Sequence, residues 1–271
     1  IIDAGALSNG ATKQTIAQGI KPYGLIYALV KAKIPVEWAI DSNKAAISQT
    51  TGNSAADFTF DCDGSGTTYT SKAYKSGAFI IPEAFAAQAQ SIVATWRTKG
   101  VTVDGPCTAD PVTPFPIFAT ISGWPRAVLD AQNGSVAATY FANAEIPAPP
   151  ATIDPTNPPA YRTAAPSQLT ACDDIYIMPH ADPTYATHNA LIPFIKAGGS
   201  FYASCHAVSE IENMVYPAAG SQVSTATGTA GTFAMNLLGT SGLVNYGSHQ
   251  AQGSVPYAFY KSPTDTAAPT T

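Results

Sequence analysis

The chain has 271 residues, of which 45% are hydrophobic and only 11% are charged. That length suits one large α/β domain, whereas the charged fraction lies well below the roughly 25% of ordinary soluble proteins. The formal net charge is −5 and no block of Lys or Arg occurs, which argues against a nucleic-acid partner.

Three further sequence features bear on where the protein is located. No apolar run approaches the ~18 residues of a membrane helix, so we expect no membrane span. The chain begins with Ile1, as a processed mature form or a fragment of a larger parent chain would. A surface built from Thr, Ser, Asn and Gln is typical of secreted proteins and of tightly packed assemblies.

The first part of the chain is predicted to form a helix followed by a strand. Apolar residues recur at helical spacing, which predicts a helix over residues 22–33. A strand is predicted over residues 34–40. A helix followed by a strand is typical of the start of a Rossmann-like or flavodoxin-like domain.

The next stretch, residues 52–78, is predicted to be a β-rich insertion. Phe58–Phe60 and Thr67–Tyr69 flank a Gly/Asp-rich turn, which predicts a hairpin. Further extended segments are expected at 72–75 and 78–81. Asp61, Asp63 and Ser65 alternate as at the start of a calcium loop, but the closing Glu is missing, and a plain turn is favoured.

The middle of the chain predicts a helix over 82–99, strands at 101–103 and 116–121, and a helix that begins at Asp130 or Asn133 and runs to Ala144. Residues 146–166 contain seven prolines. Such a segment is expected to be a second insertion, either an extended excursion across the surface or a linker within the domain.

The four cysteines occupy different kinds of segment. Cys62 and Cys107 lie in polar loops, where a surface disulfide between them fits. Cys172 and Cys205 stand at opposite ends of two neighbouring predicted strands, so a bridge between them is geometrically poor. We therefore expect Cys172 to be buried and Cys205 to be a free thiol.

The region from Cys172 to Asn213 carries the strongest pattern in the chain. Residues 174–178 form a short, largely apolar run that is typical of a buried parallel strand. Pro183 can open a helix that Gly198 and Gly199 end, and residues 201–203 form the next strand. Two successive parallel strands bring their carboxyl ends to one place, where α/β proteins bind ligands.

This region resembles the class I glutamine amidotransferase-like superfamily, most closely its intracellular-protease-like branch. The resemblance rests on Pro179, on Gly198–Gly199 and on the run Ala203–Ser204–Cys205–His206–Ala207, while His180 and Ala181 stand where the family has two glycines. It implies a flavodoxin-like three-layer sandwich with a mostly parallel central sheet. The expected organisation is one domain over residues 1–261, followed by a Thr/Pro-rich linker or tail over 262–271.

The resemblance implies that Cys205 is a nucleophile at a tight strand-to-helix turn and that His206 is its base. His249 is an alternative base, because the amidotransferases take theirs from near the C-terminus. The acid that orients the base is not placed by the pattern, and Glu210 and Glu83 are the candidates. A helix N-terminus and a neighbouring imidazolium would favour the thiolate of Cys205.

All four histidines lie in the last hundred residues, and three of them lie in or beside the two predicted strand ends. His180 either lines or blocks the oxyanion pocket of the first interpretation. An alternative interpretation is a metal site, because His206 and Glu210 would share one helix face. Zinc is favoured if Cys205 joins, calcium is the other divalent candidate, and the prediction otherwise includes no cofactor. The candidate ligands are His180, Asp182, His188 and His206.

Two functions remain open from the sequence. The first is a secreted or surface cysteine hydrolase that attacks an amide or related carbonyl of a small molecule or peptide through a thioester. The alternative is a non-catalytic extracellular structural subunit or binding module of a filament, surface layer or adhesion system. In that case the two insertions would serve as contact arms for self-assembly.

Overall fold

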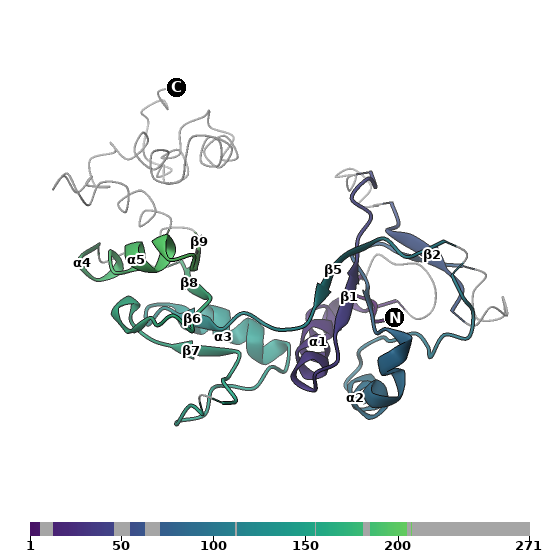
Figure 1. Cartoon of the computed structure of the whole chain (residues 1–271), viewed down its shortest axis with the longest axis horizontal. Coiled ribbons are helices and arrows are strands. Elements are labelled where there is room, and N and C mark those ends of the chain that lie inside the picture. Colours follow the sequence, from purple (N-terminus) through teal and green to yellow (C-terminus); the bar gives the residue numbers. More distant parts are fainter. Residues whose placement is uncertain are drawn as a thin grey trace, which may run out of the picture. The chain divides into compact units, whose positions relative to one another are not determined.

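The protein has a mixed α/β fold that divides into two compact units (Figure 1). The first unit comprises Ile1–Trp124 with Tyr140–Pro147, and the second comprises Pro125–Thr139 with Ala148–Thr271. A computed structural model describes residues 1–5, 13–45, 55–62, 71–111, 113–154, 156–180, 185–204 and 207.

The first unit contains two main helices and two small antiparallel sheets. Its helices are η1 (Ile16–Gln18), α1 (Lys21–Lys31), η2 (Glu83–Phe85) and α2 (Ala86–Thr98). Its strands are β1 (Val36–Ala39), β2 (Phe58–Phe60), β3 (Lys72–Tyr74), β4 (Phe79–Ile80) and β5 (Ile117–Ile121). One sheet has the order β4-β1-β5, and the other pairs β2 with β3.

The helix α1 and the strand β1 do not open a parallel sheet, which corrects the expectation for this part of the chain. Strand β1 pairs antiparallel with both β4 and β5. The local sequence pattern predicts that a strand forms after the helix. Later segments of the chain decide which strand pairs with it and whether the pairing is parallel or antiparallel. The segment 101–103, expected to be a strand, contributes only an isolated bridge between Val103 and Ile2.

The β-rich insertion forms a hairpin with a different second strand from the one expected. Strand β2 pairs with β3, with Phe58 opposite Tyr74 and Phe60 opposite Lys72. The expected partner, Thr67–Tyr69, lies outside the described residues. The turn residues Asp63 and Ser65 of the calcium-like pattern lie there too.

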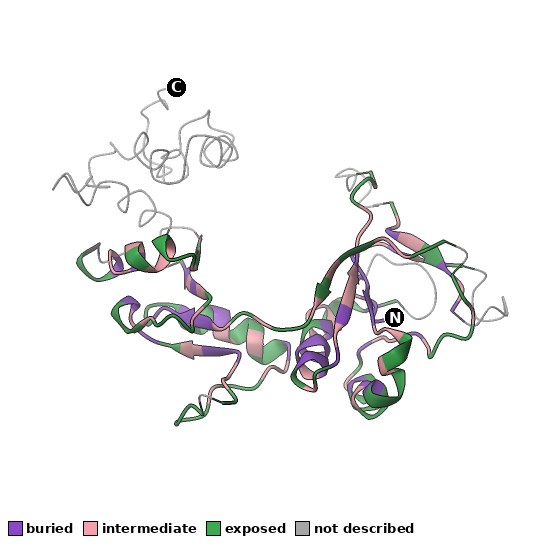
Figure 2. Ribbon diagram, viewed as in Figure 1, coloured by how far each residue is buried: buried purple, intermediate pink, exposed green. Residues whose placement is uncertain are grey.

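The core of the first unit forms where α1 packs against α2 and β4. Leu25 and Leu29 of α1 are fully buried with Phe79, and Trp96 of α2 closes the cluster. Figure 2 shows this burial along α1. Gly24 lets the helices approach, because a Cβ there would lie 1.8 Å from the carbonyl oxygen of Ala144 and 2.4 Å from Trp96.

The second unit contains a four-stranded, all-parallel sheet flanked by helices (Figure 1). The strands are β6 (Ala127–Leu129), β7 (Tyr161–Thr163), β8 (Ile175–Pro179) and β9 (Ser200–Ser204), in the order β7-β6-β8-β9. The helices are α3 (Gly134–Asn143, which runs on into the first unit), η3 (Pro166–Gln168), α4 (Tyr185–His188) and α5 (Leu191–Lys196).

The predicted parallel strands at 174–178 and 201–203 are confirmed as β8 and β9, which pair in register from Ile175↔Ser200 to Pro179↔Ser204. Apolar side chains of α5, Leu191 among them, pack with Tyr176 and Met178. The helix expected from Pro183 is instead split into α4 and α5. Pro193 explains the second start, because a proline fits the first turn of a helix better than its interior.

Two strands of this sheet differ from the sequence-based expectation. Strand β6 was not predicted, because its three buried residues are too few to show a period of two. Strand β7 lies at the end of the Pro-rich segment 146–166, which was expected to be an extended surface excursion or a linker. The prolines fall outside Tyr161–Thr163, so its backbone is free to pair with β6.

The described helices are short. The longest, α2, has 13 residues. In the part of the chain that the structure describes, no helix has both the length and the apolar character needed to cross a membrane.

We predict that Gly24→Ala destabilises the first unit. Alanine improves helix propensity by about 1 kcal/mol, but the added Cβ would overlap the Ala144 carbonyl and Trp96, and overpacking costs about 1–3 kcal/mol. The clash should dominate, so the thermal unfolding midpoint measured by circular dichroism should fall. Gly123→Ala is the matched control, because a Cβ at Gly123 meets nothing within 4 Å. An unchanged unfolding midpoint for Gly24→Ala would contradict the close approach of Gly24 to Ala144 and Trp96.

Candidate functional site

The candidate site lies at the carboxyl ends of β6 and β8, which are neighbours at the centre of the parallel sheet. From β6 the chain continues to β7 on one side of the pair, and from β8 it continues to β9 on the other. This is a topological switch point, where the two connections leave in opposite directions. In α/β sheets, ligands bind beyond the strand ends at such a point. The first residue after β6, Asp130, is tied to β8 by a backbone hydrogen bond from its N–H to the Ile177 carbonyl oxygen, 2.9 Å.

The side chain of Asp130 is the centre of a buried polar cluster. Its Oδ2 accepts a hydrogen bond from the hydroxyl of Tyr176 and lies 2.9 Å from Nε2 of His188. Its Oδ1 accepts the backbone N–H of Gln132 at 2.7 Å. Asp130, Tyr176 and His188 are 3%, 0% and 5% exposed, so the cluster is closed off from bulk water. An aspartate that holds one nitrogen of a histidine is the arrangement that orients a catalytic base.

The environment of Asp130 favours its charged form. Burial by itself would raise the pKa of the carboxyl group. The hydrogen bonds from His188, Tyr176 and the Gln132 backbone outweigh this effect and hold the pKa of Asp130 below its usual value. The carboxylate is therefore ionised at neutral pH and can fix the orientation of His188.

The backbone at this end of the sheet adopts a conformation that is uncommon for residues other than glycine. His180, directly after β8, has a φ of 48°, and Asn133, three residues after Asp130, has a φ of 58°. The two are joined, because the side-chain amide of Asn133 donates a hydrogen bond to the His180 carbonyl oxygen. The His180 N–H donates to the Ser204 carbonyl oxygen at 3.1 Å. Such strained residues persist where the surrounding structure holds them, often at functional sites.

These contacts tie the ends of three strands together. His180 is exposed, in contrast to the buried His188. Strand β9 ends at Ser204, and the next residue in the chain is Cys205. The connected strand ends are therefore followed directly, in the sequence, by the residue that is the expected nucleophile.

The structure describes some of the predicted site residues and not others. His180 and His188 both lie in the second unit, next to the strand ends. Glu83 begins η2 in the first unit. The remaining candidates lie outside the described residues: Cys205, His206, Glu210, His249 and Asp182.

The described residues do not provide a cluster of metal ligands. No group of three or more His, Cys, Asp or Glu side chains suited to a metal ion occurs among them. His188 is held by Asp130, a residue that was not among the candidate ligands. Because Asp182 and His206 are not described, the four-ligand zinc or calcium site stays a prediction.

The structure shows which of the described cysteines form a disulfide and which is a free thiol. Cys62 and Cys107 form a disulfide, the pair expected from their loop context. Cys172 is a free, exposed thiol, so the expectation that it is buried was wrong. It lies in the turn before β8, where the N–H of Asp173 bonds the Thr170 carbonyl, rather than in the strand itself.

Sequence reasoning missed the central residue of the site. Asp130 and Asn133 were noted only as potential helix caps, and Tyr176 only as part of an apolar strand. A polar residue directly after the apolar run Ala127–Leu129 was the available signal. It was too weak to use, because so short a run does not identify a strand.

The first unit also contains an open pocket of about 740 Å³. Its lining includes aromatic rings and four aspartates, of which Asp57 is the most buried. Asp57 binds Lys44 Nζ at 2.7 Å and accepts the backbone N–H groups of Asp41 and Gly77. Its charge thus serves to hold neighbouring loops.

Comparison with known proteins adds no relative to this chain. No protein-family model, curated protein or solved structure matches it.

We predict that Asp130→Asn lowers the free energy of unfolding by about 2 kcal/mol at pH 7, because hydrogen bonds to a buried charged group are lost. The pKa of Asp130 is depressed in the folded protein, so its contribution is present above its unfolded value of about 3.9 and is lost as the pH falls through the folded value. The difference between variant and wild type should therefore shrink in acid.

Urea unfolding at pH 7 and at pH 3 measures this difference. Asp110→Asn is the control, since Asp110 lies exposed in a loop of the first unit. A gap between Asp130→Asn and wild type that stays constant or widens in acid would show that the Asp130 charge is not stabilised by its partners.

Proposed function

We propose that the protein is an extracellular cysteine-dependent hydrolase of the amidotransferase-like type, with Cys205 attacking an amide or related carbonyl. The observation that carries the proposal is the Asp130–His188 pair at the switch point of the parallel sheet, one strand away from the end of β9. The strand order β7-β6-β8-β9 is, in chain order, 2-1-3-4, which agrees with a flavodoxin-like three-layer sandwich in the second unit.

The chemistry follows from the residue types. The thiolate of Cys205 would attack the carbonyl carbon, and a histidine would give its proton to the leaving amine, which leaves a thioester. Water, deprotonated by the same histidine, would then release the acid and restore the thiol. His206 and His249 are the bases that the resemblance implies. His188 is a third candidate, because Asp130 already orients its ring.

Two features support an extracellular setting. The disulfide Cys62–Cys107 persists in oxidising compartments. The charged fraction of 11% and the abundance of Thr, Ser and Pro agree with it. The organisation of residues 1–261 as one domain, with 262–271 as a tail, stays part of this proposal.

The first test measures alkylation of Cys205 by iodoacetamide against pH in native protein. Because Cys172 is also an exposed thiol, the experiment needs a Cys172→Ser background, with Cys172→Ser/Cys205→Ser as the blank. We expect fast labelling with an apparent thiol pKa well below the free-cysteine value of about 8.5. His188→Gln and Asp130→Asn in the same background should raise that apparent pKa if the pair serves Cys205.

The other outcomes are also informative. Labelling that requires a chelator would indicate a metal thiolate, and labelling that requires unfolding would rule out an activated nucleophile. An activated thiol that is indifferent to His188 and Asp130 would leave His206 or His249 as the base.

The alternative function, a structural subunit or binding module, draws support from β5. This strand forms one end of the described β4-β1-β5 sheet, and its Ile117 and Phe118 are 41% and 63% exposed. An edge strand with exposed apolar side chains can add a strand from another chain. An inert Cys205 together with concentration-dependent assembly in light scattering, reduced by Phe118→Lys, would favour this function.

A further inference from the structure

The first unit contains a fully buried lysine between two buried aspartates. Nζ of Lys72 lies 2.7 Å from Oδ2 of Asp104 and 2.8 Å from Oδ2 of Asp3. Lys72 is 0% exposed, Asp3 1% and Asp104 8%. Lysine is rarely fully buried in proteins unless it is paired, and burying three charged side chains together carries a large desolvation cost.

The backbone holds these three side chains from three different segments. Ile2 and Val103 form an antiparallel bridge, with the Asp104 N–H bonded to the Ile1 carbonyl at 2.8 Å and the Asp3 N–H to the Thr102 carbonyl at 3.2 Å. Lys72 is the first residue of β3. The amine and both carboxyl groups are therefore positioned by the fold rather than by their mutual attraction alone.

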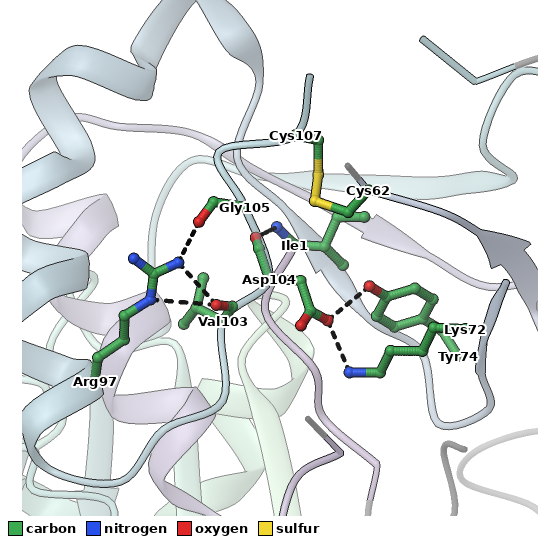
Figure 3. Close-up of a disulfide and its surroundings, with 9 residues drawn as sticks. All are labelled: Ile1, Cys62, Lys72, Tyr74, Arg97, Val103, Asp104, Gly105 and Cys107. Carbon is green, nitrogen blue, oxygen red and sulfur yellow. Dashed lines mark hydrogen bonds and ion pairs between the residues drawn. A yellow bond between two sulfur atoms is a disulfide. The ribbon is translucent and has the colours of Figure 1, made fainter. Parts of the chain in front are cut away.

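Tyr74 distinguishes the two carboxyl groups. It stands two residues after Lys72 on the same face of β3, and its hydroxyl donates a hydrogen bond of 2.7 Å to Oδ2 of Asp104 (Figure 3). A donor on that oxygen polarises the carboxyl group of Asp104 and stabilises negative charge that develops on it. Asp3 instead accepts the backbone N–H of Gly5 at 2.9 Å on its Oδ1, with its Oδ2 toward the amine.

We propose that Lys72 and Asp104 condense to an intramolecular isopeptide bond, with Asp3 as the proton carrier. Nζ of Lys72 attacks Cγ of Asp104, and the new C–N bond replaces the bond from Cγ to Oδ1. Oδ2, held by Tyr74, becomes the amide carbonyl oxygen. Two of the three protons of the ammonium group leave with Oδ1 as one water molecule, and Asp3 passes them on and ends as the carboxylate it began as.

The reaction needs no oxidant, cofactor or activated intermediate, because the ammonium and carboxylate groups together contain all the atoms of an amide and a water. In dilute solution this condensation is unfavourable. Groups held in a reactive geometry react as if at effective concentrations of about 10⁵–10⁸ M, because the entropy of bringing them together has already been lost on folding. The product replaces the buried charges of Lys72 and Asp104 with a neutral amide, while the Asp3 carboxylate keeps its hydrogen bond from the Gly5 N–H.

The position of the bond gives it a structural role. Residues 72 and 104 lie inside the loop closed by Cys62 and Cys107, next to the disulfide (Figure 3). An amide at this point would keep β3 attached to the segment after α2 when the disulfide is reduced. Such a bond resists reductants and force, and it is independent of the hydrolase chemistry proposed for the second unit.

The test is the intact mass of the folded protein, taken after denaturation and reduction of the disulfide. We expect the mass to be lower than the sequence mass by one water molecule, and a protease digest to contain one branched peptide that joins Lys72 to Asp104. Lys72→Arg should have the full mass. Asp3→Asn, which keeps both reacting groups, should form the bond at least about 100-fold more slowly.

Two controls separate this bond from other events. Asp104 precedes Gly105, and an Asp–Gly succinimide also loses one water, but it is cleaved by hydroxylamine and would persist in Lys72→Arg. Lys44 and Asp57 form an internal comparison, because their atoms are also 2.7 Å apart but Lys44 is partly exposed. That pair should stay unlinked.

A wild-type protein that keeps the full sequence mass after prolonged incubation in the folded state would overturn the proposal. So would a water loss that maps to Asp104–Gly105 alone. Either result can be read from the wild type, so the test does not depend on whether a variant folds.

Discussion

Burial of the Asp130 carboxylate constrains the end of the parallel sheet. An ionised group at 3% exposure is stable only if its oxygens are bound, and here Tyr176, His188 and the Gln132 backbone bind them. Each partner comes from a different segment, so satisfying one charge fixes the relation of β6, β8 and α4. The position of His188 follows from this requirement rather than from its short helix.

Further hydrogen bonds connect the ends of the strands. The Asn133 amide bonds the His180 carbonyl, and the His180 N–H bonds the Ser204 carbonyl, so the three strand ends form one connected edge. The positive φ angles at His180 and Asn133 are maintained by these bonds. Glycines, which the resembled family has at 180–181, would reach this conformation without strain, whereas His180 adds an exposed imidazole at the same point.

In the first unit, the buried charged groups form ion pairs, in contrast to the hydrogen-bonded Asp130 of the second unit. Lys72, Asp3 and Asp104 are enclosed together, and the apolar cluster of Leu25, Leu29 and Trp96 forms a separate core. The close approach of α1 to Ala144 depends on Gly24. The two units thus share a chain and an α/β composition, but one is built on antiparallel pairs and the other on a parallel sheet.

The sequence by itself determined the elements with a clear period or a clear breaker: α1, α2, β8 and β9, together with the Cys62–Cys107 pair. The sequence also indicated that the candidate functional site lies at the end of β8. Only the tertiary structure decided that β1 is antiparallel, that three residues at β6 form a central strand, and that Asp130 meets His188. The physical reason is that periodicity records whether a residue is buried, whereas strand direction and side-chain partners depend on segments distant in the chain, such as the 58 positions that separate His188 from Asp130.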